Sequence, residues 1–517
     1  MNKNPIYSYT YGDAGAVRGE LDSDRRRVDP TGCVFSHSRA TPLKSGTGRR
    51  SGLALAALIA LGVACGCQRT EESRPDIILI VLDTVRADRV GGVSPTGLRL
   101  TPELDALANR SRRWPQAMAT APLTMPSMAA IFTGRYGDAV GVIGHSAKDR
   151  LDRENDTLAS LAQDAGYATA AVVTNPWLAR RPMGFLRDFD AITTGRNSGK
   201  GSGGARMSAV DVTDAALHAV DAVIGEAGNS DRPLLLWAHY MDAHMPYDTG
   251  LKETEANRLL REYSAPGADR QKIYFAPNFT ESEIAATRTA YDAAVHSIDQ
   301  QIGRLLDGLR NRGRASNSVI VIVSDHGEAL GEHELHFAHD FTVYDELIRA
   351  VLMISAPGLP VGVDDRPAST VDLLPTLCSL AALPCPANLA GTDLTSDRAR
   401  ENRALFAASA PRRERYARAP WLTVDGPDGR MTAIRKGRLK LVRTPAASAP
   451  RTEVFDLSSD PEELVNIHDP ELHTGMNQEL DAWLERMERS RDDRPVRSAQ
   501  PRGNRLREEL RLLGYVD

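Results

Sequence analysis

The chain has 517 residues, of which 42% are hydrophobic, so it is long enough to bury a large core and to form more than one domain. Its formal net charge is −5 at pH 7 and its isoelectric point is about 6.2, which excludes the strongly basic surface expected of a nucleic-acid-binding protein. Short arginine clusters, such as RRR at 25–27, are interleaved with acidic residues and are expected to be solvated surface.

An apolar stretch near the start of the chain has the pattern of an export signal. Residues 49–67, RRSGLALAALIALGVACGC, place two arginines before a short apolar run that ends in small residues and cysteine. This run is shorter than the roughly 20 residues of a transmembrane helix. Its end is similar to the site where bacterial lipoproteins are cleaved and acylated, with Cys65 or Cys67 as the acceptor; a conventional or uncleaved signal is the alternative. We therefore expect an exported protein, held by a lipid anchor in the periplasm or at the cell surface.

From residue 76 onward, continuous apolar runs alternate with helical patterns. The runs are β-branched or leucine-rich, as in strands that are buried on both faces of a parallel sheet. They occupy residues 76–83, 168–174, 233–240, 318–325 and 350–356. Helices are expected at residues 101–111, 156–166, 211–228 and about 280–311. This alternation predicts an α/β domain over residues 76–400, with a mostly parallel, doubly wound sheet.

The two ends of the chain differ from this pattern. Beyond residue 400, short alternating strands such as AIRKGRLKLVRT predict a smaller α+β domain over residues 401–487. Residues 488–517 are expected to form a charged linker and a terminal amphipathic helix. Residues 1–48 are polar and lack apolar periodicity, which predicts a disordered extension and a true start further along the chain.

Two of the five cysteines, Cys378 and Cys385, lie in the predicted α/β domain. In an oxidising compartment they can pair. Two ordinary buried thiols are the alternative.

The stretch TMPSMAAIFTG, residues 124–134, begins a short apolar helix. Pro126 suits the first helical position, and the free N–H groups and positive dipole end of such a helix favour an anion. The Thr124 hydroxyl ahead of this helix has two interpretations. It is either a helix cap or a nucleophile that faces a sulfate or phosphate.

Polar side chains follow three of the predicted strands where these strands end. They are Asp83 after the first strand, Asp242 and His244 after the third, and Asp325 and His326 after the fourth. Ligands of an open α/β sheet bind beyond the carboxyl ends of its strands. We therefore expect Asp83, Asp325 and His326, together with Thr124, to bind one divalent cation, which lowers the pKa of the hydroxyl and polarises an ester oxygen.

The loop GEHELHFAHD adds His333, His336 and His339. Their spacing is not that of metal ligands on a helix. One of them can reach the site as a general acid, and the other two are expected at the surface.

Several motifs, in the correct order over roughly residues 75–470, resemble those of the sulfatase family in the alkaline-phosphatase superfamily. IILIVLDTVRADRVG resembles the family's first metal-binding strand, and SVIVIVSDHGEALGEH resembles its second. TMPSMAAIFTGRY is similar to its Cys/Ser-x-Pro-Ser-Arg-x-x-x-x-Thr-Gly pattern, and HYMDAHMPY to its substrate-contacting loop. The resemblance implies an alkaline-phosphatase-like fold and a hydrolase of sulfuric or phosphoric esters.

The resemblance also implies a role for each candidate residue. Thr124 is the nucleophile and a metal ligand, Asp83, Asp325 and His326 are metal ligands, His244 contacts the anion oxygens, His339 is the proton donor to the leaving group, and Asp242 is a weaker member of the site. The metal is calcium, manganese or zinc, and the imidazole of His326 suits manganese or zinc better than a purely oxygen site would.

Two departures from the family pattern bear on the chemistry. Thr124 stands where sulfatases carry the Cys or Ser that becomes formylglycine, and Met128 replaces the arginine that the modifying enzyme requires, so no formylglycine is expected. A phospho-threonine can be displaced in line at phosphorus, whereas a sulfo-threonine lacks the exit that a formylglycine diol has. The departures therefore favour phosphate esters as substrates, and sulfate esters are the alternative.

These features predict an exported, metal-dependent hydrolase that cleaves sulfate or phosphate esters of a small molecule, glycan or lipid. One alternative is a phosphoglycerol-type transferase acting on a glycan or lipid. Another is a non-catalytic protein that binds anionic glycans, because Met128 stands in place of the family's arginine.

Overall fold

The computed structural model describes residues 74–95, 97–146, 148–195, 206–225, 231–247, 280–396, 402–409, 429–445 and 450–492. These residues fall in the unit that runs from Glu71 to Asp517. The predicted extension, export signal and terminal helix lie outside the described residues. Within the described part of the chain, no helix combines the length and the apolar character needed to cross a membrane.

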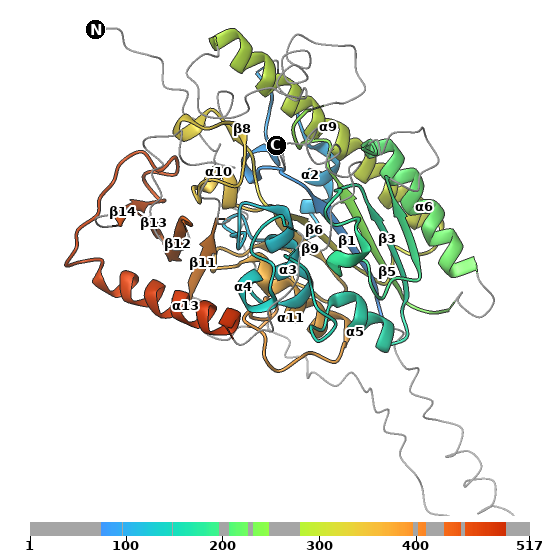
Figure 1. Ribbon diagram of the computed structural model, residues 1–517. Coiled ribbons are helices and arrows are strands. Elements are labelled where there is room, and N and C mark those ends of the chain that lie inside the picture. Colours follow the sequence, from blue (N-terminus) through green and yellow to red (C-terminus); the bar gives the residue numbers. More distant parts are fainter. Residues whose placement is uncertain are drawn as a thin grey trace, which may run out of the picture. The chain divides into compact units, whose positions relative to one another are not determined.

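An eight-stranded sheet lies at the centre of the α/β region (Figure 1), and its strand order is β10-β2-β9-β6-β1-β5-β3-β4. Its strands are β1 Asp76–Leu82, β2 Arg112–Arg113, β3 Ala168–Val173, β4 Ala191–Thr194, β5 Leu234–Tyr240, β6 Ser318–Ser324, β9 Leu352–Ser355 and β10 Gly362–Val363. The consecutive strands β6, β1, β5, β3 and the edge strand β4 run parallel, and β9 is antiparallel to β6. The predicted α/β class with a mostly parallel sheet is confirmed.

Helices cover both faces of this sheet (Figure 1). One group consists of α2 Pro102–Ala108, α6 Ala209–Gly225 and α9 Glu281–Asn311, and the other of α3 Thr124–Thr133, α5 Leu158–Asp164 and α11 Leu373–Ala381. Strand β1 shows why the sheet is doubly wound. Its side chains Ile78 and Ile80 pack in the core with the first group, whereas Ile77 and Leu79 pack with the second. All four are fully buried, which explains the unbroken apolar run in the sequence.

A second, antiparallel sheet follows in the chain, with α13 packed on it through Leu480 and Trp483. It consists of β11 Ala404–Ala408, β12 Thr432–Lys436, β13 Leu439–Thr444 and β14 Arg451–Asp456, and α13 spans Thr474–Asp492. The helix thus continues into the stretch that was expected to be linker from residue 488. The high charge of residues 488–492, ERSRD, led to the prediction of a linker. The helix continues through them because they contain no Gly or Pro that would stop it.

A buried ionic cluster ties the small sheet to the central one. Lys440 of β13 is fully buried, and its Nζ lies 2.7 Å from Asp345 Oδ1 and 2.8 Å from Glu463 Oε1. Asp345 begins the short helix α10, Asp345–Ile348, which leads into β9. The cluster therefore joins a strand of the small sheet, the helix that precedes β9, and the loop after β14, which are distant in the sequence.

Replacing Lys440 with alanine is expected to lower the free energy of unfolding by about 3–5 kcal/mol, because two buried carboxylates then lose their cation. Unfolding in urea measures this change. Lys436→Ala is the control, because Lys436 on the adjacent strand pairs with Glu479 at the surface, where such pairs contribute about 1 kcal/mol or less. Similar losses in the two variants would contradict a stabilising role for the buried cluster.

Candidate functional site

Four predicted site residues meet at the carboxyl ends of β1 and β6. Asp83 follows β1, Asp325 and His326 follow β6, and the two strands are parallel neighbours, so their ends coincide. One ligand atom from each of these three residues lies within 4.8 Å of the other two. Thr124, the first residue of α3, has its Oγ1 3.3 Å from His326 Nε2. All four side chains are fully buried.

The Thr124 hydroxyl does not cap helix α3. The helix begins at Thr124 itself, and its N-cap residue is Leu123, which makes no side-chain capping bond. The cap interpretation is therefore wrong, and Pro126 occupies the third helical position, not the first. It still lies in the first turn, where its missing N–H costs no helical hydrogen bond. Ser127 Oγ donates to the backbone oxygen of Asp325 at 2.6 Å, which fastens this turn to the end of β6.

The two carboxylates are poised for a cation. Burial raises the pKa of Asp83 to about 7, and the charge of Asp325 adds to the shift. Burial likewise raises the pKa of Asp325 to about 7, although the N–H groups of Thr84 and His326 donate to its Oδ1 at 3.2 and 2.8 Å. Asp83 Oδ1 and Asp325 Oδ2 have no hydrogen-bond partner among the described residues. Buried, unsatisfied carboxylate oxygens fit a divalent cation, which supplies the missing positive charge.

His326 directs a nitrogen lone pair toward the carboxylates of Asp83 and Asp325. Its Nδ1 donates to the Gly327 carbonyl at 2.9 Å, which leaves Nε2 unprotonated beside Thr124 and Asp325. Burial, with the charge of His339, lowers the pKa of His326 to about 4, so the ring is neutral at pH 7. A neutral imidazole whose other nitrogen is fixed by a carbonyl is the usual form of a metal-binding histidine.

Thr84, which directly follows Asp83, supports the site through its backbone. Its φ is 62°, an unusual value for a β-branched residue, and such strain costs about 1–3 kcal/mol. This conformation directs the Thr84 N–H at Asp325, while its Oγ1 donates back to the Asp83 carbonyl at 2.7 Å. Thr84 is thus a donor to a candidate ligand.

His339 reaches the site after a small hairpin, β7 Ala329–Leu330 and β8 His336–Ala338. Its ring centroid lies 4.6 Å from that of His326, and its Nδ1 lies 3.0 Å from Glu328 Oε1. Burial alone would lower the pKa of His339, but Glu328, with Asp340 and Asp83, raises it to about 9. The ring is therefore an imidazolium at pH 7, the form that a general acid needs.

The other two histidines of this loop lie elsewhere. His333 stacks on Tyr344 with 3.8 Å between ring centroids and pairs with Glu346 at 3.1 Å. His336 is half-buried beside Phe337. Of the three, His339 is the one that the fold brings against His326.

Asp242 and His244 have roles that the sequence did not indicate. Asp242 Oδ1 accepts the N–H of Ala209 at 3.0 Å and so holds the start of α6. His244 lies beside His339, with 4.9 Å between ring centroids, and its Nδ1 donates to the Met245 carbonyl at 2.6 Å. Burial, followed by the charge of His339, lowers the pKa of His244 well below its ordinary value. Its Nε2 then carries a lone pair, and the predicted contact of His244 with anion oxygens stays a prediction.

Met128, Cys378 and Cys385 lie apart from this chemistry. Met128 is fully buried in the hydrophobic core that includes Phe132 and Leu377, so no cation replaces the family's arginine at this position. The two cysteines are free thiols, Cys378 buried and Cys385 exposed. The expectation of two buried thiols is therefore wrong for Cys385, because it follows the end of α11.

Sequence reasoning gave no role to two residues that lie beside Asp83. Asn175 Nδ2 donates to Asp83 Oδ2 at 3.1 Å, and His239 Nε2 lies 3.5 Å from the same oxygen. His239 is part of the apolar run of β5, where it pairs in register with Val81 of β1. Its position near the carboxyl end of a strand was the signal that could have identified it.

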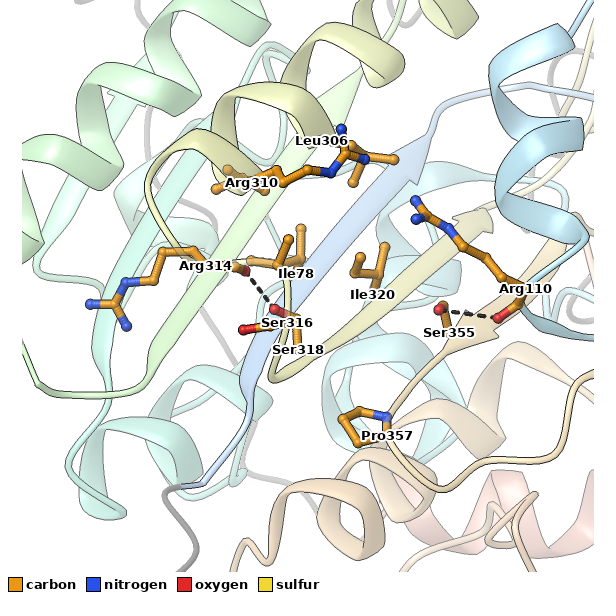
Figure 2. Close-up of a pocket in the computed structure, with 12 residues that line it drawn as sticks. Ile78, Arg110, Leu306, Arg310, Arg314, Ser316, Ser318, Ile320, Ser355 and Pro357 are labelled. Carbon is orange, nitrogen blue, oxygen red and sulfur yellow. Dashed lines mark hydrogen bonds between the residues drawn. The ribbon is translucent and has the colours of Figure 1, made fainter.

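The hollow in Figure 2 lies at the amino ends of β1 and β6, opposite the candidate site. It measures about 120 Å³ and is lined by Arg110, Arg310 and Arg314. Arg110 follows α2 and Arg310 lies in the last turn of α9, where the negative end of a helix dipole favours cations. Arg314 pairs with Asp76 at 3.2 Å. We therefore interpret these arginines as stabilising the ends of α2, α9 and β1, and not as a ligand site.

Comparisons with known proteins bear on this arrangement. A family model described as "Sulfatase" matches residues 75–383. The chain is 25% identical over 451 residues to the ulvan-active sulfatase of Formosa agariphila, covering 81% of each protein. It is 25% identical over 445 residues to the choline-sulfatase of Rhizobium meliloti, covering 76% of this chain and 82% of that one. Among solved structures, the phosphonate monoester hydrolase of Agrobacterium radiobacter matches with a TM-score of 0.60 and 21% identity, over 81% of this chain and 96% of that one.

Proposed function

Because the chain belongs to the sulfatase family, we propose that it is a metal-dependent hydrolase whose nucleophile is Thr124. The chain is a hydrolase of sulfuric or phosphoric esters. Thr124, Asp83, Asp325 and His326 would hold one divalent cation. The observation that supports this proposal is the buried Thr124 hydroxyl, 3.3 Å from the unprotonated Nε2 of His326 and free of any capping role.

The residues divide the reaction between them. A bound divalent cation lowers the pKa of a hydroxyl that it contacts and polarises the ester oxygen. Thr124 Oγ1 releases its proton to solvent and attacks phosphorus, the bond to the leaving oxygen breaks, and the His339 imidazolium gives that oxygen its proton. The neutral His339 then takes a proton from the water molecule that attacks the phospho-threonine, the bond from phosphorus to Thr124 Oγ1 breaks, phosphate is released, and Thr124 Oγ1 regains a proton from solvent. Glu328 holds the proton on His339 by keeping the pKa of His339 high.

We propose phosphoric esters as better substrates than sulfuric esters. A hydrated formylglycine expels sulfate by collapsing to the aldehyde, and the hydroxyl of Thr124 has no such route. In-line displacement at phosphorus needs only a positioned nucleophile and compensation of the developing charge. The two curated relatives, whose names refer to ulvan and to choline, support a glycan or small-molecule ester. Residues 49–67 support export with a lipid anchor at Cys65 or Cys67.

An ester panel tests this function. The full chain is stripped of metal and assayed against an aryl sulfate, an aryl phosphate monoester and an aryl phosphodiester, with calcium, manganese and zinc in turn. We expect negligible turnover without metal, recovery with manganese or zinc, and faster cleavage of a phosphoric than of the sulfuric ester. Full activity in the stripped protein would contradict metal dependence, and turnover of the sulfate ester alone would contradict the preference for phosphorus.

A further inference from the structure

The turn that follows β3 contacts the candidate metal ligand Asp83. Asn175 in this turn is fully buried, and its Oδ1 accepts the N–H groups of Trp177 and Leu178 at 3.0 and 3.4 Å. Its Nδ2 donates to Asp83 Oδ2 at 3.1 Å. One amide therefore closes the turn with its oxygen and holds the carboxylate with its nitrogen.

The same turn also supports the start of helix α3. The Trp177 ring, which is fully buried, stacks on His145 with 5.5 Å between ring centroids and 16° between ring planes. His145 Nε2 accepts the N–H of Met125 at 3.1 Å. Met125 directly follows Thr124, so the position of the nucleophile depends on this contact.

These contacts form a continuous path from Asp83 to Thr124. It runs from the Asp83 carboxylate through Asn175, Trp177 and His145 to the backbone of Met125. Three hydrogen bonds and a ring stack thus relate the candidate metal ligand to the nucleophile through this turn and His145. A carboxylate that binds a metal depends on such a partner, because rotation about its side chain otherwise misdirects the ligand oxygen.

We propose that Asn175 is a positioning residue, which orients Asp83 for the cation and, through the turn that it closes, aligns the start of α3. The inference rests on the metal centre proposed above. Asn175 holds Oδ2 of Asp83, so Oδ1, which lacks a hydrogen-bond partner among the described residues, is the oxygen left for the cation. His239 of β5, the strand beside β1, approaches the same Oδ2 at 3.5 Å, so Oδ2 has a second neighbour, whereas Oδ1 has no hydrogen-bond partner in the described part of the chain.

Asn175→Ser separates the two functions of the side chain. A serine hydroxyl can still accept the Trp177 N–H and close the turn, but it is too short to reach Asp83. We expect the dissociation constant for manganese and zinc, measured by competition with a chromogenic chelator, to rise about 10- to 100-fold. The unfolding temperature of the metal-free protein should fall by only a few degrees, because the turn keeps its bond to Trp177 and the main loss is the buried hydrogen bond to Asp83.

Asn466→Ser is the matched control. Asn466 Oδ1 accepts the N–H groups of Val454 and His468 at 3.0 and 2.9 Å, so it closes a similar turn after β14. This variant should bind metal like the wild type. Unchanged metal affinity in Asn175→Ser, or an equal loss in both variants, would overturn the proposal. A wild-type chain that binds neither metal would overturn the metal centre itself, which is a distinguishable result.

Discussion

Replacing Thr124 with alanine is expected to lower kcat/KM for the preferred ester by about 10⁴- to 10⁶-fold, because the reaction loses its nucleophile. The hydroxyl is the group of α3 that lies against His326 Nε2, and alanine leaves no oxygen at this position. Steady-state kinetics with metal present measure the loss. Mass spectrometry of acid-quenched enzyme should find a phosphorylated peptide containing Thr124 in the wild type and none in the variant.

Two further variants make the Thr124 result specific. Thr124→Ser keeps a hydroxyl at the same position and should retain activity within about 10- to 100-fold of the wild type, because binding and charge stabilisation are intact. Thr133→Ala makes the same substitution as Thr124→Ala, at the other end of α3, where Oγ1 donates to Ala129. It should leave kcat/KM unchanged. Equal rates in the wild type and Thr124→Ala would exclude Thr124 as the nucleophile.

Replacing His339 with glutamine is expected to lower kcat/KM by about 10²- to 10⁴-fold for esters of weakly acidic alcohols, which need a proton as they leave. Esters of acidic phenols should lose much less, because a phenolate leaves without protonation. Comparing a 4-nitrophenyl and an alkyl phosphate ester measures this difference. An equal loss for both leaving groups would contradict a role as proton donor.

The pH dependence tests the same residue. The acid must be protonated, so its contribution is present at pH 7 and is lost as the pH rises through the pKa of His339, about 9. The wild type should therefore show an alkaline limb near pH 9 that His339→Gln lacks. Glu328→Gln removes the main cause of the raised pKa and should move the limb to lower pH. His333→Gln, in the same loop, should leave the profile unchanged.

The elements that the sequence predicted best are those with the strongest burial. Strands β1, β5 and β6 appear as unbroken apolar runs because both of their faces are covered, and the structure reproduces each within two residues. Asp83, Asp325 and His326 could also be grouped from the sequence. They follow parallel strands, and the carboxyl ends of such strands meet at one edge of the sheet.

Other properties of the site depend on contacts between segments that are distant in sequence. The contact of Asn175 with Asp83 joins residues 92 positions apart, and the contact of Thr124 with His326 spans 202 positions. No local sequence pattern indicates that either pair of residues is in contact. The raised pKa of His339 and the lowered pKa of His244 depend similarly on which neighbours surround each buried ring.

The amino-acid sequence by itself determined the parallel α/β architecture, the edge of the sheet that carries the chemistry, and the types of residue gathered there. Periodicity and strand ends encode these features locally. Only the tertiary structure decided that Thr124 begins a helix without capping it, that Asp242 supports α6, and that His339 carries the proton. Hydrogen-bond partners and protonation states follow from the packing of distant segments, because burial and neighbouring charges, not residue type, set the energy of a proton or a metal ion at each atom.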